Sequence, residues 1–232
     1  MSLYLRSSLR SVLLATSLLL LATSSQAQTT YGGRAYGIFV DVPTMGVTNV
    51  LVSDTGQLPA AGGQLTSEVL NAVVTGPPIL FIPIANADVL TDTTQGGSNQ
   101  AQSVALATGV VLLADHAARI TASVVRAQSN AACVWTVGSS TVLNLTFGGS
   151  AVTVTGAPNQ VVTIPGVATL TINEQISSTD SNTASMTVNA LHLRLITGDE
   201  IIVSHAESSV DNCPPPLPVQ PTTWSAVKIR QR

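Results

Sequence analysis

Apolar and polar residues alternate along much of this chain with the two-residue period of half-buried β-strands. Residues 142–147 show the alternation most clearly, and a Gly-Gly turn follows them at 148–149. Further turn residues occupy 156–159, and Pro165-Gly166 interrupts the chain again. The pattern predicts a succession of antiparallel strands joined by short turns.

Two apolar segments, residues 193–196 and 201–203, flank the polar sequence Thr-Gly-Asp-Glu at 197–200. Glycine adopts the positive φ that tight hairpin turns need, and Asp is common beside it. The pattern predicts an antiparallel hairpin with Gly198 and Asp199 at its tip.

One strand, between residues 186 and 195, changes the side that its apolar residues occupy. Even positions are apolar up to Ala190, and odd positions are apolar from Leu191 onward. A β-bulge, or a strand that passes from one sheet to another, produces such a change of face. Devices of this kind are needed at the corners of sandwiches and barrels.

Two other regions are harder to assign from their patterns. Within residues 64–74, apolar residues four positions apart favour a helix, with a strand as the alternative. Residues 79–84 predict a short strand, and the polar, glycine-bearing residues 91–102 predict a surface loop.

The composition agrees with a β-rich fold. Hydrophobic residues make up 45% of the chain and charged residues only 9%, and Lys228 is the only lysine. Small and β-branched residues suit a pleated, half-buried surface, while few helix-forming Glu, Lys or Arg residues remain for exposed helix faces. We expect an all-β protein over residues 28–213, an antiparallel β-sandwich that is either jelly-roll-like or built from two stapled β units.

A faint internal repeat motivates the second of these arrangements. The tripeptide Val-Thr-Gly occurs at 74–76 and at 154–156, each time before a proline and an Ile-Pro pair. Cys133 lies 59 residues after the start of the first tripeptide, and Cys213 lies 59 residues after the start of the second. Two copies of one β unit produce this spacing, and chance matching of common residues is the alternative.

The first residues have the order of a secretory signal peptide. Arg6 and Arg10 precede a leucine-rich stretch at 12–22, and Ser25-Gln26-Ala27 then places small residues where a signal peptidase cuts. The apolar stretch is shorter than the roughly 20 residues of a transmembrane helix. We expect residues 1–27 to be removed, with a membrane anchor as the alternative, and no membrane-spanning segment in the mature chain.

Cys133 and Cys213 are the only cysteines. An even number in an exported chain predicts a disulfide, and closing a loop of about 80 residues stabilises a fold by roughly 4 kcal/mol. Neither cysteine has a local histidine or cation to activate it for catalysis. Trp135 is expected to pack on the bridge.

Charge is distributed unevenly along the chain. Residues 28–213 contain all 12 acidic residues and four arginines, a net charge of −8 (4 − 12) with neutral histidines. This acidity argues against a nucleic-acid partner, and solubility is its simplest explanation. Residues 214–223 predict a stiff proline-rich spacer, and residues 224–232 predict a short basic tail that is either an attachment or sorting element or a frayed end. The tail residues of interest are Trp224, Lys228, Arg230 and Arg232.

Several short segments of the chain form a recognisable set. They are Gly-Arg-Ala-Tyr-Gly at 33–37, Phe-Gly-Gly at 147–149, Pro-Asn at 158–159, Ile-Pro-Gly at 164–166, Asn-Glu-Gln at 173–175, Val-Asn-Ala-Leu-His at 188–192 and Asp-Asn-Cys at 211–213. In these segments the chain resembles a family of bacterial surface proteins called choice-of-anchor P. The resemblance covers residues 33–213 and implies an exported surface domain with no catalytic residues to carry over. Here the proline spacer and basic tail replace a recognisable anchor, so the mode of surface retention stays open.

The sequence predicts no catalytic residue, cofactor or metal. His116, His192 and His205 lack zinc-ligand spacing, and the chain has no Gly-x-Ser-x-Gly motif. His192 alternates with leucines and is expected to face solvent or a polar contact. Asp88 and Asp92 carry oxygen ligands that calcium prefers, without the spacing of a recognised calcium loop.

A polar tripeptide centred on Glu174 is the most distinctive candidate site. Its side chains either satisfy backbone groups of a turn at a strand end, or Glu174 binds calcium or a partner together with Asn173. The candidate interaction residues are Asn173, Glu174, Gln175, Asn189 and His192.

We therefore expect an exported cell-surface or extracellular structural or interaction protein that is not an enzyme. The expected partner is a component of the cell envelope or extracellular matrix, or a second copy of the chain. A secreted module that binds a glycan or calcium is the alternative, and a secreted hydrolase is a more remote one.

Overall fold

The computed structural model describes residues 28–76 and 83–213. The expected signal peptide at 1–27, most of the strand expected at 79–84, the proline spacer at 214–223 and the basic tail at 224–232 lie outside these residues. Within them the chain is almost entirely strand. The elements are β1 (Thr30–Val42), η1 (Pro43–Met45), β2 (Val47–Asp54), β3 (Gly63–Thr75), β4 (Pro83–Gly97), β5 (Gln100–Leu112), β6 (Ile120–Ala132), β7 (Trp135–Leu143), β8 (Thr146–Phe147), β9 (Ser150–Ala151), β10 (Gln160–Ile164), β11 (Ala168–Thr179), β12 (Thr183–Leu195) and β13 (Glu200–Asp211).

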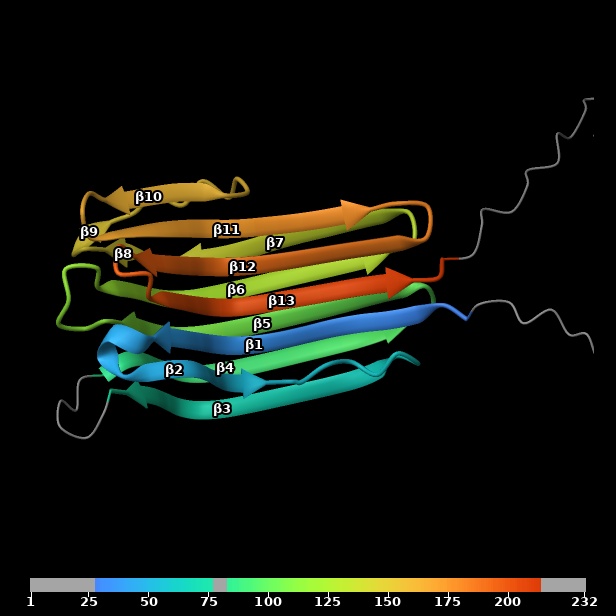
Figure 1. The fold of residues 1–232 in the computed structure, drawn as a ribbon, viewed down its shortest axis with the longest axis horizontal. Helices are drawn as coiled ribbons and strands as arrows, with labels where there is room; N and C mark the ends of the chain where they lie inside the picture. Colours follow the sequence, from blue (N-terminus) through green and yellow to red (C-terminus); the bar gives the residue numbers. More distant parts are fainter. Residues whose placement is uncertain (1–27, 77–82, 214–232) are drawn as a thin grey trace, which may run out of the picture.

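The strands form two antiparallel sheets that stack face to face as a β-sandwich (Figure 1). The six-stranded sheet has the order β10-β11-β12-β13-β1-β2, and the seven-stranded sheet contains β3 to β6, β8 and β9, with β7 paired to β6. In Figure 1 the first sheet lies in front of the second, and their strands run nearly along the same direction. The expected all-β sandwich is confirmed.

Successive strands mostly stay in one sheet, so each sheet is built from a meander. The chain runs from β3 to β7 in one sheet and from β10 to β13 in the other. β1 extends the second sheet by pairing with β13, and β2 follows β1 at the edge. A jelly roll instead passes its chain repeatedly between the sheets. The strand order therefore matches two β units, β3–β6 and β10–β13, each of four strands and each followed by a cysteine.

Cys133 and Cys213 are paired at disulfide distance, with their Cα atoms 5.4 Å apart. One follows β6 and the other follows β13, so the bridge joins the two sheets at one end of the sandwich. Small residues pack around it, and Tyr31 is the aromatic residue in contact with this cluster. Trp135 does not pack on the bridge as expected, because its side chain lies exposed on the outer face of β7.

The hairpin around Gly198 is confirmed, since β12 and β13 pair from Arg194 and Glu200 outward. The helix favoured for residues 64–74 is wrong, because this segment is the edge strand β3. Leu65 and Val69 are four apart because polar Ser67 occupies the position between them on the same face, and Val73 lies on the other face, beyond the change of face at Asn71. The loop expected at 91–102 is also wrong, because these residues belong to β4 and β5, joined by a tight turn at Ser98 and Asn99.

The change of face predicted in β12 is confirmed, and it is one part of a feature that crosses both sheets. At the same level in ten neighbouring segments, one residue is skipped in the pairing register, or two between β4 and β5 and between β7 and β8, and we call the set given next the transverse row. Its members are Asn173, Ala190, Ser204, Gly37 and Ser53 in one sheet, and Asn71, Asp88, Gly109, Ser123 and Asn144 in the other.

Every second member of the transverse row has a left-handed backbone, with φ between 54° and 60°. This conformation costs a non-glycine residue about 1–2 kcal/mol and is most tolerable for Asn and Gly. At Gly109 a Cβ atom would also lie 2.0 Å from Oδ2 of Asp88, so a larger residue there would displace that carboxylate. Beyond each left-handed residue the alternation is reversed, so that the other set of side chains faces inward. The neighbouring strands reverse their alternation at the same level.

The transverse row divides the interior into two unlike halves. On the side of Gly198, which we call the aliphatic half, lie all but one of the largest fully buried side chains, the exception being Leu90. On the side of the disulfide, which we call the small-residue half, the inner positions are mostly Gly, Ala, Ser and Thr. There a Cβ atom on Gly33 would lie 2.4 Å from Oγ1 of Thr94 in the opposite sheet, so the sheets approach closely.

Candidate functional site

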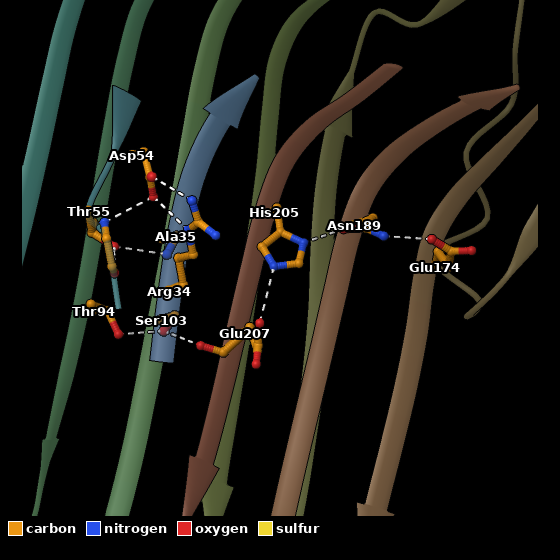
Figure 2. A network of polar contacts seen from close by, with 11 residues as sticks. Arg34, Ala35, Asp54, Thr55, Thr94, Ser103, Glu174, Asn189, His205 and Glu207 are labelled. Carbon is orange, nitrogen blue, oxygen red and sulfur yellow. Dashed lines mark hydrogen bonds and ion pairs between the residues drawn. The ribbon is translucent and has the colours of Figure 1, made fainter. Parts of the chain in front are cut away.

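A continuous set of polar side chains crosses the outer face of the six-stranded sheet, and we call it the polar belt. Its members come from β2, β1, β13, β12 and β11, and they touch one another through hydrogen bonds, ion pairs and ring stacking. Figure 2 shows the part of the belt that runs from Asp54 and Arg34 through Glu207, His205 and Asn189 to Glu174. They are Asp54, Arg34, Tyr36, His205, Glu207, Asn189, Glu174, His192, Glu200 and Arg194.

The polar belt lies over the transverse row, and this position explains why side chains on an outer face are buried. Where the alternation inverts, the outward residues of a strand are three positions apart instead of two, as Asn189 and His192 are on β12. Both reach the same oxygen of Glu174 from opposite sides of the row. As a result only 3% of His192 and 8% of His205 is exposed.

At the β2 side, Arg34 binds Asp54 with two hydrogen bonds, from Nε at 2.9 Å and from Nη2 at 2.7 Å. This bidentate contact is the main reason that the pKa of Asp54 is lowered. Tyr36 stacks on the ring of His205, with centroids 4.3 Å apart and an interplanar angle of 5°. Burial raises the pKa of the Tyr36 hydroxyl above its ordinary value.

In the centre of the polar belt, Nδ1 of His205 lies 2.6 Å from Oδ1 of Asn189. The Nδ2 group of Asn189 donates to Oε2 of Glu174 at 2.6 Å (Figure 2). Since the amide oxygen of Asn189 accepts and its amide nitrogen donates, His205 must carry its proton on Nδ1 to complete the chain. Three strands are joined by these two bonds.

His192 lies between two carboxylates. Its Nδ1 is 2.6 Å from Oε2 of Glu174, and its Nε2 contacts Oε1 of Glu200. The Nε group of Arg194 lies 3.1 Å from the same Nε2. A charged ring donates to both carboxylates, whereas a neutral ring donates to Glu174 and accepts from Arg194, so the contact of Nε2 depends on protonation.

The contacts of Glu174 strongly favour its ionised form. The hydrogen bond from His192 is the main cause that lowers its pKa to about 2, and the bond from Asn189 acts in the same direction against burial. The carboxylate is thus committed to neighbours within the sheet. Its contacts hold the strands together and leave little capacity for a ligand.

The polar belt touches a surface depression at its edge, through Arg194. Three open depressions of about 370, 650 and 580 Å³ lie on the surface, and none is lined by the histidines or carboxylates of the belt. Among the described residues, no group of three or more His, Cys, Asp or Glu side chains is placed to hold a metal ion.

The structure brings together three of the five predicted interaction residues: Glu174, Asn189 and His192. His192 makes the polar contact that was one of its two expected environments, and it does not face solvent. His205 was not predicted as a member, although its place at a change of face, directly after Ser204, is the signal that identifies it. The roles of Arg34 and Asp54 depend on strand pairing and had no signal in the sequence.

Asn173 and Gln175 lie on the other side of β11 from Glu174. The Nδ2 group of Asn173 donates to the carbonyl of Gly156 at 3.0 Å. The Nε2 group of Gln175 donates to Oδ1 of Asn173 at 2.9 Å and to the carbonyl of Gly138, in β7 of the opposite sheet, at 3.1 Å. These two residues satisfy backbone groups, as one of the two interpretations predicted, and do not share a site with Glu174.

The outer face of the seven-stranded sheet differs from the belt-bearing face. Its side chains are mainly Thr, Ser, Gln and Val, and cross-strand pairing aligns them in rows over β3 to β7. In these rows the charged members are Glu68 and Arg126. Several apolar side chains on this face are exposed: Leu70, Val73, Trp135, Val137 and Leu143. This face therefore presents mainly uncharged side chains, several of them apolar and exposed.

Comparisons of the chain with known protein families, with characterised proteins and with solved structures found no match in any of the three. Over residues 28–76 and 83–213, no helix combines the length and apolar character of a membrane span.

Proposed function

We propose that this protein is exported and acts outside the cell as a structural or interaction domain without catalytic activity. The observation that carries the proposal is the contrast between the two outer faces. Titratable side chains on the six-stranded sheet are occupied by one another, while the seven-stranded sheet presents exposed apolar and hydroxyl groups. Exposed apolar side chains also occur on the six-stranded sheet, at Leu51, Val161 and Ile176, but they are more numerous on the seven-stranded sheet, where few charged groups accompany them. Apolar groups gathered on a face of this kind are typical of an interaction surface.

Two further observations support export. The first 27 residues have the order of a signal peptide. The pairing of Cys133 with Cys213 suits an oxidising compartment, because disulfides persist there and are reduced in the cytosol. The partner of the proposed function is a component of the cell envelope or extracellular matrix, or a second copy of the chain.

We also propose a relationship to the choice-of-anchor P surface proteins. The segments that carry the resemblance at 33–37, 173–175 and 188–192 contain the transverse-row residues Gly37, Asn173 and Ala190, and also contribute members of the polar belt. Motifs at these places define how the sandwich is built. A family that shares these motifs would share the fold, and residues on other surfaces would determine which partner each member binds.

The proposed function is tested with the chain from residue 28 onward, incubated with intact bacteria and with isolated envelope fragments. We expect the protein to sediment with cells or fragments, or to associate with itself in analytical ultracentrifugation. Val137→Glu should abolish this behaviour, because a buried interface does not tolerate an unpaired carboxylate. Ile176→Glu is the matched control, since Ile176, on β11 of the other sheet, is at least as exposed as Val137.

If the protein neither sediments with cells or fragments nor self-associates, the proposed function is wrong. Equal loss of binding in both glutamate variants would also contradict it, because the seven-stranded sheet would then have no special role. Residues 1–27 are tested separately, by fusing them to a reporter enzyme that is active only after export.

A further inference from the structure

We propose that the disulfide end of the seven-stranded sheet binds a neutral polysaccharide. This inference rests on the proposed function and names the chemistry of its partner. The site, which we call the amide face, lies on the outer surface of β3 to β7. Its members are Gln64, Gln95, Gln100, Gln102, Asn130, Trp135 and Val137.

Cross-strand pairing brings the amides into one line although they are distant in sequence. Gln64 pairs with Gln95, Gln95 with Gln102, and Gln102 with Asn130. Neighbouring strands are about 4.8 Å apart, so four side chains in line span about 14 Å. This length accommodates a few linked sugar rings lying across the strands.

The amide line is partly ordered before any ligand binds. The Nε2 group of Gln95 donates to Oε1 of Gln102 at 2.9 Å. This bond holds the two side chains in place and leaves Oε1 of Gln95 as an acceptor and Nε2 of Gln102 as a donor. Sugar hydroxyls both donate and accept, so a line of amides offers them the complementary groups without a charge.

The shape and the apolar rim suit a sugar chain. An open depression of about 650 Å³ lies along the β4–β5 turn, lined by glutamines, by Ser98 and by glycines that leave the backbone accessible. Beyond it, Trp135 is 42% exposed and Val137 is 53% exposed on the same face. An indole ring offers a broad apolar surface with a polar N–H, which matches the alternating C–H and O–H groups of a pyranose.

The distribution of charge selects a neutral ligand. The nearest charged side chains on this face, Glu68 and Arg126, share a cross-strand row that is separated from the amide line by a row of Thr, Val, Gln and Ser. The amide face therefore has no cation to bind an acidic polymer. The net charge of −8 (4 − 12) over residues 28–213 further repels such polymers.

The test is retention of the chain from residue 28 onward on insoluble cellulose, chitin and starch, with alginate gel as an acidic polymer. We expect binding to at least one neutral polymer that resists salt and no binding to alginate. Trp135→Ala and Gln102→Ala should each weaken the binding about tenfold, the effect of losing one stacking or hydrogen-bonding contact. Ile176→Ala, on the opposite sheet, should bind as the unmodified protein does, and thermal melting checks that every variant is folded.

Several outcomes overturn the inference. Retention on none of the three neutral polymers does so, as does equal retention by all three variants or stronger retention on alginate. Self-association that Gln102→Ala removes would show that a second copy, and not a glycan, covers the amide face. If the protein binds intact cells but no neutral polymer, this inference fails while the proposed function stands.

Discussion

The two halves of the sandwich interior are packed with side chains of opposite kinds, large in one half and small in the other. In the aliphatic half, large side chains such as Leu193, Ile201 and Leu112 fill the space between the sheets. In the small-residue half, Ala and Ser dominate, and side chains of one sheet bond the backbone of the other. Ser103 donates to the carbonyl of Glu207 at 2.5 Å, and Ser204 donates to that of Val125 at 2.9 Å.

The difference shows that one sandwich can be stabilised by buried volume at one end and by close approach at the other. Few methylene groups are buried in the small-residue half, so burial of apolar area contributes less there. In this half, cross-sheet hydrogen bonds and the disulfide provide stability that buried apolar volume does not. Each half should therefore respond to a different kind of substitution.

Removing the disulfide should have the largest effect, because it acts on the half with the least apolar volume. We expect the double variant Cys133→Ser, Cys213→Ser to lose about 4 kcal/mol of unfolding free energy, as the chain-entropy model predicts for a loop of about 80 residues. Urea denaturation of the variant and of the reduced unmodified protein should agree. Equal stability of the oxidised protein and the double variant would contradict the role assigned to the bridge.

Truncation in the aliphatic half should be the next most damaging change. Leu193 is 1% exposed, and Leu193→Ala should lower the unfolding free energy by about 3 kcal/mol through lost burial and a residual cavity. Leu143→Ala is the control, because Leu143 is 49% exposed. A loss below about 1 kcal/mol at Leu193 would mean that volume does not stabilise this half as we describe.

Asp92 makes the stability of the small-residue half depend on pH. It is fully buried, and burial raises its pKa to about 7 from 3.8. Neither oxygen has a hydrogen bond of standard length and angle, although the Ser53 hydroxyl and the backbone N–H groups of Leu106 and Gly37 lie near enough to oppose part of the rise. The folded protein thus binds this proton more tightly than the unfolded chain does. Its contribution is most favourable below about pH 4 and is lost as the pH rises through about 7.

Asp92→Asn should therefore raise the unfolding free energy at pH 8 by about 2 kcal/mol, roughly half the full linkage, since a buried amide still lacks partners. Denaturation measured from pH 4 to pH 8 should show a flatter profile for the variant. Asp115→Asn, at an exposed carboxylate, should leave the profile unchanged. If the unfolding free energy of the variant fell more steeply with rising pH than that of the unmodified protein, the Asp92 carboxylate would have hydrogen-bond partners in the folded protein.

Enlarging a residue in the small-residue half should damage it although apolar area is added. Ala206 is fully buried, and Ala206→Leu should cost about 2 kcal/mol because the sheets cannot separate without breaking cross-sheet bonds. Ala157→Leu, at an exposed turn, is the matched control. If Ala206→Leu were neutral or stabilising in thermal denaturation, the close approach of the sheets would be refuted.

The smallest effect is expected in the polar belt, which joins the two halves from outside. Glu174→Gln should lose about 1 kcal/mol at pH 7, a value reduced from the full linkage because the group is partly exposed to solvent. The depressed pKa of Glu174 gives stability above about pH 4.5 that is lost as the pH falls toward 2. Variant and unmodified protein should therefore converge in acid, whereas the exposed Glu68→Gln should match the unmodified protein throughout.

Alternation of apolar residues was enough to predict the β-sandwich, the hairpin at Gly198 and the change of face after Ala190, because these depend on local patterns of period two. The same reasoning assigned a helix to β3, since Ser67 occupies the position between Leu65 and Val69 on their face, and the inversion at Asn71 then places Val73 on the other face. It assigned a loop to residues 91–102, since polar residues such as Asp92 and Thr94 are not expected on an inner face. Both errors come from the transverse row and the small-residue half.

By itself the amino-acid sequence determined the fold class, the pairing of the only two cysteines, and the grouping of Glu174, Asn189 and His192 as residues of interest. The alternation of residues acts within single strands, and two cysteines allow only one pairing. These features therefore needed no three-dimensional information. Only the tertiary structure decided that ten segments invert at one level, that His205 and Arg34 complete the polar belt, and that four amides form a line. Those arrangements depend on the register between strands distant in the chain, and register is set by packing of the whole sandwich.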